Sequence, residues 1–412
     1  MTAAPALHAF AGYGVELEYM IVDRRTLAVA PIADALLRAA AGSDASEVER
    51  GRFGWSNEIV LHLVELKNTR PQPSLESLVA GFQAEIGAIN RLLQPMGACL
   101  MPAGMHPWMN PAAETRLWPH DQASIYQAYD RIFDCRQHGQ ANLQSVHLNL
   151  PFANDAEFAR LHAAVRVLLP ILPAIAASSP IADGAPGGYL DTRMACYCTA
   201  VRRVPSVIGQ VIPDTAGSRA EYETQVLAPM YRDIAPLDPE GVLRHEWLNA
   251  RGAIPRFDRS ALEIRVIDVQ ECPRADLAIA AAATAVIRTL YDGRWSSLAL
   301  QQAVSTDSLA KILHACIRDA DQAVIDDAGY LRLLGLSDPS YRAGELWRHL
   351  IIRTGLNRST FWFETLHVML EHGPLARRIL RALAQDGSIA RQQQVYRTLC
   401  DCLETGHMFV EA

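Results

Sequence analysis

Two glutamates near the start of the chain have the spacing of a cation site. Glu16 and Glu18 alternate with the apolar residues Val15, Leu17 and Tyr19. Residues two apart on a strand point to the same side of the sheet, and two carboxylates there repel each other unless a positive charge neutralises them. Mg²⁺ is the usual partner, because it prefers hard oxygen ligands and shares them with phosphates. A solvated face of an edge strand would show the same alternation, so the pair alone leaves both interpretations open.

Further carboxylates and one histidine lie inside apolar runs typical of strands. Glu58 and Glu65 bracket N-E-I-V-L-H-L-V-E-L, Glu263 lies in L-E-I-R-V-I-D, and His147 lies in Q-S-V-H-L-N-L. Polar groups in such runs are costly to bury unless they are paired. His147 taken alone is also typical of a satisfied core histidine. Together these residues predict one polar floor that holds several cations. Glu58 and Glu65 have opposite strand parity, so one of them requires a bulge or a position beyond the strand end.

Three arginines accompany these polar segments, namely Arg193, Arg251 and Arg265. The planar guanidinium fork matches phosphate and carboxylate groups. Any one of them, Arg193 included, is also compatible with an ordinary surface charge. As a set they favour a site for an anionic substrate beside the carboxylates.

Zinc chemistry is a weaker interpretation of the same sequence. His106, His120 and His147 would allow a zinc hydrolase, but glutamates outnumber histidines in the candidate site, and oxygen ligands favour magnesium over zinc. The eight cysteines form no C-x-x-C pair, which removes the usual zinc signature.

The elements that must position these residues are predicted by apolar periodicity. The strands alternate rather than forming solid apolar runs, which argues against a doubly wound parallel sheet. They favour an α+β fold, an antiparallel sheet with helices on one face. We expect a catalytic domain over residues 1–295 and a helical C-terminal region, 296–412, packed on it. The predicted strands cover 14–22, 59–66, 142–152 and 262–268, the helices 75–93 (Ser74 as N-cap), 158–177 and 275–291, and a loop 180–191.

Composition excludes several classes of protein. The chain has 412 residues, half of them hydrophobic, and a net charge of −7, so it offers no basic footprint for nucleic acid. It shows no secretory leader and no apolar stretch long enough for a bilayer. Reduced thiols in the cytoplasm are therefore expected. Neither G-x-G-x-x-G nor G-x-x-x-x-G-K-[ST] is present, so any nucleotide binds without these loops.

The order of the short motifs resembles that of the glutamate–cysteine ligase superfamily. The chain is most similar to the bacterial carboxylate–amine ligase branch of the plant-like type, from about residue 12 to about residue 290. Each motif is short and moderately specific, and their joint order carries the resemblance. The motifs are G-V-E-L-E-Y, N-E-I-V-L-H-L-V-E-L-K, G-M-H-P-W, Q-S-V-H-L-N-L, A-S-S-P and L-E-I-R-V-I-D.

This resemblance implies a glutamine-synthetase-like fold, a curved antiparallel sheet whose concave face holds ATP and Mg²⁺ on strand carboxylates. It implies that Arg265 touches the transferred phosphate, with Glu263 beside it in the catalytic set. Gln144 and Asn149 match polar positions near substrate or nucleotide, and Arg193 matches an arginine that holds the acidic substrate. Arg251 lies in W-L-N-A-R-G, where Asn249 replaces an acid found in relatives. The implied metal ligands are Glu16, Glu18, Glu58, Glu65, His147 and Glu263.

The implied reaction is the ATP-dependent joining of a carboxylate to an amine, with γ-glutamyl bonds among the products, through an acyl phosphate. A closing loop must exclude water from that intermediate, and the Gly-rich stretch 184–188 is the candidate. A guanidino-kinase-like phosphotransferase and a non-catalytic nucleotide-binding relative remain as alternatives. The expected partners are an amino-acid carboxylate and an amine. Their identities stay open, as does the oligomeric state, with a homodimer among the options.

Overall fold

The computed structural model describes residues 6–410 and contains the expected α+β architecture. Its centre is an eight-stranded sheet in which every pairing is antiparallel. The order is β2-β3-β4-β1-β6-β10-β9, and β5 pairs with the far end of β1. The strands are β1 (Gly14–Asp23), β2 (Glu47–Arg50), β3 (Phe53–Asn57), β4 (Leu63–Asn68), β5 (Ala98–Met101), β6 (Ser145–Pro151), β9 (Ala253–Arg256) and β10 (Ala261–Asp268).

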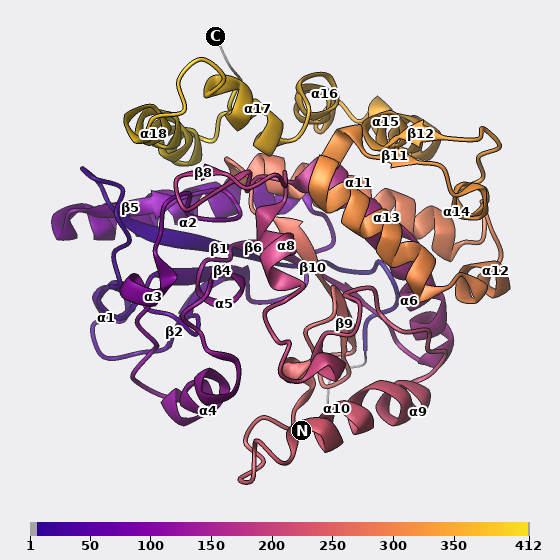
Figure 1. Ribbon diagram of the computed structural model, residues 1–412, viewed down its shortest axis with the longest axis horizontal. Coiled ribbons are helices and arrows are strands. Elements are labelled where there is room, and N and C mark those ends of the chain that lie inside the picture. Colours follow the sequence, from indigo (N-terminus) through magenta and orange to yellow (C-terminus); the bar gives the residue numbers. More distant parts are fainter. Residues whose placement is uncertain (1–5, 411–412) are drawn as a thin grey trace.

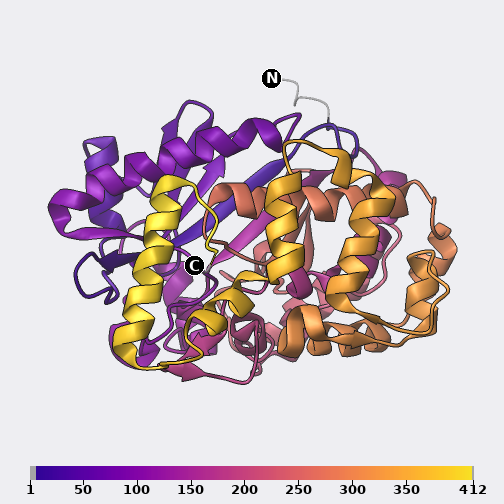
Figure 2. The ribbon, with the colours of Figure 1, turned by 90° about the horizontal axis from the view of Figure 1, so that it is seen from above.

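A layer of helices covers one face of this sheet, and Figure 2 looks down on it. Val15, Leu17 and Tyr19 of β1 are buried in the main hydrophobic cluster together with apolar residues of these helices. The layer forms because the odd-numbered positions of β1 are apolar and need a cover. Its helices are α2 (Glu76–Leu93), α6 (Asp155–Leu168), α11 (Pro273–Tyr291), α15 (Ala343–Thr354), α16 (Phe363–His372) and α18 (Ile389–Thr405).

Shorter helices and loops surround the other face of the sheet, below it in Figure 1. They are α3 (Pro111–Glu114), α4 (Ala123–Phe133), α5 (His138–Ala141), α8 (Thr192–Tyr197), α9 (Arg219–Tyr222) and α10 (Ala228–Ile234). The remaining helices are α1 (Ala33–Ala41), α7 (Pro173–Ala176), α12 (Leu298–Ala303), α13 (Thr306–Asp319), α14 (Ala328–Leu333) and α17 (Leu375–Ala382).

Several predicted elements differ in detail from the structure. The predicted strand 59–66 is wrong in its first half, because the chain turns at residues 59–62 between β3 and β4. The predicted helix 158–177 breaks into α6, a 3-10 turn and α7 at Pro170 and Pro173, since proline interrupts helical hydrogen bonding. Leu75 rather than Ser74 occupies the N-cap of α2. Residues 181–186 form a small hairpin, β7 (Ile181–Ala182) and β8 (Ala185–Pro186), inside the expected loop.

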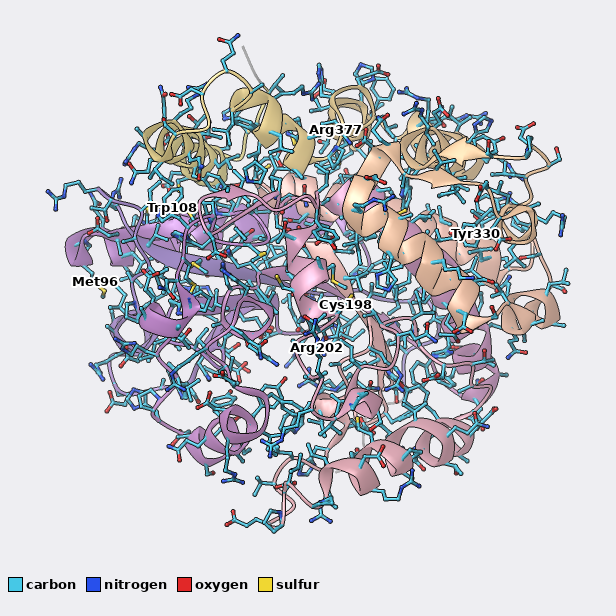
Figure 3. The ribbon with its side chains drawn as sticks, in the orientation of Figure 1. Met96, Trp108, Cys198, Arg202, Tyr330 and Arg377 are labelled. Atoms are coloured by element: carbon cyan, nitrogen blue, oxygen red, sulfur yellow. The ribbon has the colours of Figure 1, made fainter. Side chains whose placement is uncertain are left out.

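The C-terminal region is mainly helical, with one added hairpin of β11 (Val324–Ile325) and β12 (Tyr341–Arg342). It docks through buried polar contacts as well as apolar ones. The hydroxyl of Tyr330, labelled in Figure 3, donates to the Val167 carbonyl at 3.0 Å, and Trp347 Nε1 donates to the Ile171 carbonyl at 2.7 Å. One hydrophobic cluster contains residues from both sides of position 295. The division into two domains at that position stays a prediction.

A buried ion pair joins α17 to the segment before α11. The guanidinium of Arg378 contacts Glu271 and the Phe409 carbonyl, and the side chains of Arg378 and Glu271 are 1% and 0% exposed. Glu271 also accepts a hydrogen bond from the Phe409 backbone N–H at 3.2 Å. Among the described residues, no helix is both long enough and apolar enough to span a membrane.

We predict that Arg378→Met lowers the free energy of unfolding by about 3–5 kcal/mol, because it leaves the Glu271 carboxylate buried without a cationic partner. Urea unfolding followed by circular dichroism measures this change. Arg348→Met is the matched control, since Arg348 and its partner Glu371 are each 43% exposed and such pairs contribute less than about 1 kcal/mol. Equal losses in the two variants would contradict the prediction.

Candidate active site

The pairing register gathers the polar strand residues on one face of the sheet. Glu16 of β1 lies opposite His147 of β6 on one side and Lys67 of β4 on the other, and Glu18 lies opposite Glu65. Directly paired residues project to the same face. The polar floor predicted from the sequence is therefore present as a geometric arrangement, on the face away from the helical layer.

His147 is the central cation of this floor. Its Nδ1 lies 3.1 Å from Glu16 Oε2, and its Nε2 lies 3.6 Å from Glu18 Oε1 and 3.0 Å from Ser145 Oγ. Burial would lower the pKa of His147, but the hydrogen bond with Glu16 and the charges of Glu18 and Glu263 raise it to about 9. Burial would likewise raise the pKa of Glu16, yet His147 lowers it to about 2. Without a bound metal ion, the imidazole is therefore a buried positive charge beside two carboxylates. It must lose a proton before a ring nitrogen can bind a cation.

The carboxylates on β4 and after β3 are less well compensated. Burial and the nearby charge of Glu16 raise the pKa of Glu65 to about 7, although Lys67 Nζ lies 3.1 Å from its Oε1. Burial and the charges of Glu18 and Glu65 raise the pKa of Glu58 well above its usual range. On this side of the floor, burial and the neighbouring carboxylates therefore disfavour the ionised forms of Glu58 and Glu65.

The opposite parity of Glu58 and Glu65 is resolved by the chain turn. Glu65 lies within β4, whereas Glu58 lies one residue beyond the end of β3. Position 58 is thus free of the strand alternation, and its side chain lines the same cavity as Glu18. This is the second of the two possibilities that the sequence left open.

A bulge in β10 brings Asp268 to the same face as Glu263 and Arg265. Between Ile264 and Ile267 the register with β6 shifts, so that Glu263 lies opposite Asn149 and Asp268 lies opposite Ser145. Without the bulge, positions 263 and 268 would face opposite sides, because side chains alternate along a strand. Arg265 lies inside the bulge with its Nε 3.1 Å from Glu263 Oε1.

Asp268 holds Arg193 at the end of the floor. The Arg193 Nε donates to Asp268 Oδ1, and both side chains are almost fully buried. Asp268 also accepts hydrogen bonds from the Ser178 backbone N–H and the Ser179 hydroxyl, each at 2.8 Å. These serines belong to the A-S-S-P motif. A side chain at Gly104 would meet the Asp268 carboxylate at 2.4 Å, so glycine is required there by the close approach.

Two cavities lie along the floor. The first has a volume of about 220 Å³ and is lined by Glu18, Glu58, His147, Arg193 and Arg265, with the rings of Tyr126, Tyr129 and Tyr197 as part of its wall. The second, of about 640 Å³, is lined by Glu16, Glu47, Glu49, Lys67, Asn149 and Arg259. Glu16 and Glu18 of β1 thus contribute one carboxylate to each cavity.

The structure places two of the predicted binding residues away from both cavities. Gln144 is fully buried, and its Oε1 accepts the Met20 backbone N–H at 2.7 Å. Arg251 is bonded to Asp214 at 2.8 Å and to the Ser206 carbonyl at 3.1 Å. Asn149, by contrast, lies in the larger cavity and donates to Glu16 Oε1 at 3.1 Å.

The three histidines of the zinc interpretation do not form a common site. His106 is buried with its Nε2 2.8 Å from the Leu27 carbonyl, and His120 lies 3.2 Å from Asp34 near the surface. In the part of the chain that the structure describes, the residues able to offer three ligand atoms within 4.8 Å of one another are Glu16, Glu65 and His147.

Four residues of the site are not among those predicted from the sequence, although the position of each in the sequence gives some indication of its role. Ser145 shares strand parity with His147, and its backbone N–H and hydroxyl donate to Glu18 at 2.8 and 2.9 Å. Lys67 follows Glu65 at the same parity. Asp268 ends the L-E-I-R-V-I-D motif, but only the bulge brings it to this face. Tyr197 follows Arg193 by one helical turn in α8.

Comparison with known proteins decides the family. The family model described as glutamate-cysteine ligase family 2 matches residues 13–396. The chain belongs to glutamate–cysteine ligase family 2. Membership confirms the resemblance drawn from the motifs and makes the chain an ATP-dependent carbon–nitrogen ligase by class.

Two relatives show how far the sequence likeness extends. An uncharacterised protein of Archaeoglobus fulgidus is 32% identical over 402 residues, covering 96% of this chain and all of that protein. A Bradyrhizobium sp. protein named "Putative glutamate--cysteine ligase 2" is 27% identical over 290 residues, covering 68% of this chain and 62% of that protein. The family motifs therefore occur in proteins of more than one length.

Solved structures confirm the fold. A glutamate–cysteine ligase from Francisella tularensis in complex with AMP has a TM-score of 0.57 at 12% identity, covering 95% of this chain and 91% of that one. A bifunctional glutathione synthetase from Pasteurella multocida has a TM-score of 0.61 at 13% identity, covering 96% and 53%. This family-2 ligase thus has the antiparallel-sheet architecture that the resemblance implied.

The floor of this family-2 ligase fits a hard divalent cation. Its donors are carboxylate oxygens with one imidazole, the set that suits magnesium rather than a soft metal. Burial, and then the neighbouring carboxylates, raise the pKa values of Glu58 and Glu65, and a bound divalent cation would favour their ionised forms. The donor chemistry and the charge balance therefore agree.

We predict that Glu65→Gln stabilises the magnesium-free protein by about 1 kcal/mol at mildly alkaline pH, where the wild-type carboxyl is ionised beside Glu16 and opposite Glu18. The same variant should gain less thermal stability from added Mg²⁺. Thermal unfolding with and without Mg²⁺ tests both parts. Glu240→Gln, at an exposed position, is the control. A Glu65→Gln protein that keeps the full Mg²⁺ effect would contradict the assignment of position 65 to the cation site.

Proposed function

We propose that this protein joins an amino-acid carboxylate to an amine at the expense of ATP, through an acyl-phosphate intermediate. The observation that carries the proposal is the floor itself, a row of carboxylates and cations with a cavity at each end. Such a row can align an acidic substrate with a nucleotide triphosphate across a shared cation site.

We assign the carboxylate substrate to the smaller cavity. Arg193 is held by Asp268, and its Nη2 is buried without a hydrogen-bond partner. A buried guanidinium nitrogen without a partner is costly, and a substrate carboxylate would satisfy it. The volume of about 220 Å³ suits a molecule of amino-acid size.

We assign ATP to the larger cavity, where Lys67 and Arg259 supply positive charge beside Glu16. The residues that would hold Mg²⁺ are Glu16, Glu65 and His147, with Glu18, Glu58 and Glu263 around them. The cation supplies charge neutralisation for the phosphate oxygens when it is bound. Arg265 lines the smaller cavity with its Nε 3.1 Å from Glu263 Oε1, and we assign this guanidinium to the transferred phosphoryl group.

The proposed chemistry needs no covalent enzyme nucleophile. The substrate carboxylate oxygen attacks the γ-phosphorus of ATP, the bond to the β-phosphate oxygen breaks, and ADP leaves. Arg265 balances the charge that spreads over the phosphoryl oxygens. Burial would lower the pKa of Arg265, but Tyr197, Glu263 and Glu18 raise it, so the guanidinium stays charged. The amine then attacks the acyl carbon, loses a proton and expels phosphate.

The names of the relatives suggest glutamate as the donor and cysteine as one acceptor to test. The chain aligns with 62% of the Bradyrhizobium protein's length, so these substrates remain proposals for this chain. The stretch 184–188 stays the candidate closing loop. The Gly184 carbonyl accepts a hydrogen bond from Gln392 of α18 at 2.7 Å, which ties that loop to the C-terminal region. Eight free cysteines are compatible with the cytoplasm, the compartment we propose.

We expect phosphate release from Mg²⁺-ATP to require both a carboxylate donor and an amine acceptor. A matrix of amino-acid donors and amines, with mass spectrometry of the products, measures this. A new amide in the spectrum would identify the substrates. A phosphorylated product formed without any amine would instead establish the phosphotransferase alternative and overturn the ligase proposal.

We expect Arg265→Lys to lower kcat by at least about tenfold with little change in ATP affinity, because a point charge does not replace a guanidinium fork in the transition state. An effect confined to ATP affinity would remove Arg265 from the catalytic role. Steady-state kinetics and calorimetry with ATP separate the two.

We expect Glu16→Gln and Glu263→Gln each to abolish ATP turnover while the circular dichroism spectrum stays unchanged. Each substitution removes the charge of one floor carboxylate, while the glutamine amide keeps the size and shape of the side chain. Glu240→Gln is again the control. Wild-type turnover in either floor variant would contradict the cation-floor model.

A further inference from the structure

A third cavity lies on the opposite side of the sheet from the candidate active site. Its volume is about 340 Å³, and it opens where the start of α2 meets α11 and the ends of the C-terminal helices. Tyr13 lines it, whereas Gly12 and Gly14, its chain neighbours, line the larger active-site cavity. The two cavities are therefore separated by the first residues of β1 and share no lining residue.

The charge of this cavity is positive. Arg288 and Arg294 line it, and Glu76 is the one carboxylate among its lining residues. Neither arginine forms an ion pair with a carboxylate in the described part of the chain. The guanidinium of Arg288 lies 4.7 Å from the centre of the Phe10 ring, which holds the cation near the cavity without neutralising it.

The N-terminus of α2 adds to this positive potential. Ser74, Leu75 and Glu76 line the cavity, and no side chain caps the N-terminus of this 18-residue helix. The first backbone N–H groups of a helix lack internal partners and favour anions. Glu76 is the one acidic residue in this first turn.

A buried hydroxyl supplies an independent indication of a ligand. Thr284 of α11 lines the cavity, is 6% exposed, and its Oγ1 has no hydrogen-bond partner. The nearby Thr289 shows the usual alternative, since its hydroxyl donates to the Ala285 carbonyl at 2.9 Å. A buried polar group without a partner is costly, and an anionic oxygen in the cavity would accept from Thr284.

We propose that this cavity is a binding site for a small organic anion, a molecule with one phosphate or carboxylate group on an apolar body. The anionic group would contact Arg294, Thr284 and the start of α2. The apolar body would pack against the rings of Tyr13 and Trp362, which are 8% and 6% exposed and line the same cavity. The site is separate from the catalytic cavities and does not depend on the proposed reaction.

Calorimetric titration of the full chain without nucleotide tests this proposal. Phenyl phosphate and phenylacetate are the probes, because they share an apolar ring and differ in the anionic group. Inorganic phosphate, which lacks the ring, should bind more weakly than phenyl phosphate. The better of the two ring compounds identifies whether the site prefers a phosphate or a carboxylate.

Two variants locate the bound probe. Arg294→Gln should weaken binding at least about tenfold, since a hydrogen bond to a charged group is lost. Thr284→Val should weaken it several-fold without lowering the melting temperature, because the hydroxyl has no bond to lose in the free protein. Arg232→Gln, on α10 with its side chain 74% exposed, is the control and should bind as the wild type does.

The proposal is overturned if neither ring compound binds saturably in the millimolar range. It is also overturned if both cavity variants bind with wild-type affinity, because the probe would then lie elsewhere, the active site included. A loss in Arg232→Gln equal to that in Arg294→Gln would show non-specific attraction and would overturn it as well.

Discussion

The concentration of carboxylates on one face of an antiparallel sheet is the constraint on which this structure depends. Strand pairing sets Glu16 beside His147 and Glu18 beside Glu65, and like charges at such distances are costly unless cations compensate them. The protein supplies a buried imidazolium, Lys67 and the guanidinium groups of β10 and α8. This compensation is uneven, and we propose that a divalent cation and a nucleotide bind where it is weakest.

The β10 bulge links this floor to the smaller cavity. It adds one residue to the strand, so that both Glu263 and Asp268 reach the polar face. Asp268 then fixes Arg193. Ser178 and Ser179 donate hydrogen bonds to the Asp268 carboxylate, and Gly104 leaves the space that this carboxylate occupies. One local irregularity therefore explains three separate sequence motifs.

Packing of the helical layer on the sheet offsets the unfavourable free energy of the charged face. The apolar side of β1 and β6 is buried against α2 and α11, and the C-terminal helices close over them. Burial of apolar area is the main favourable contribution to folding, and here it offsets the repulsion on the other face. The same layer leaves a positively charged cavity where the start of α2 lies near Arg288 of α11 and Arg294 beyond the end of that helix.

The sequence by itself determined the class of fold, the strands at 14–22 and 262–268, the helix at 75–93 and the residues of the polar floor, because alternation and helical periodicity are local properties. Motif order added the family. The tertiary structure alone decided that Gln144 and Arg251 bond within the protein interior while Ser145, Lys67 and Asp268 join the site. It also resolved the parity of Glu58 and Glu65 through a turn. The physical reason is that register, bulges and close approaches depend on which strands pair, and pairing is a property of the whole chain rather than of any segment.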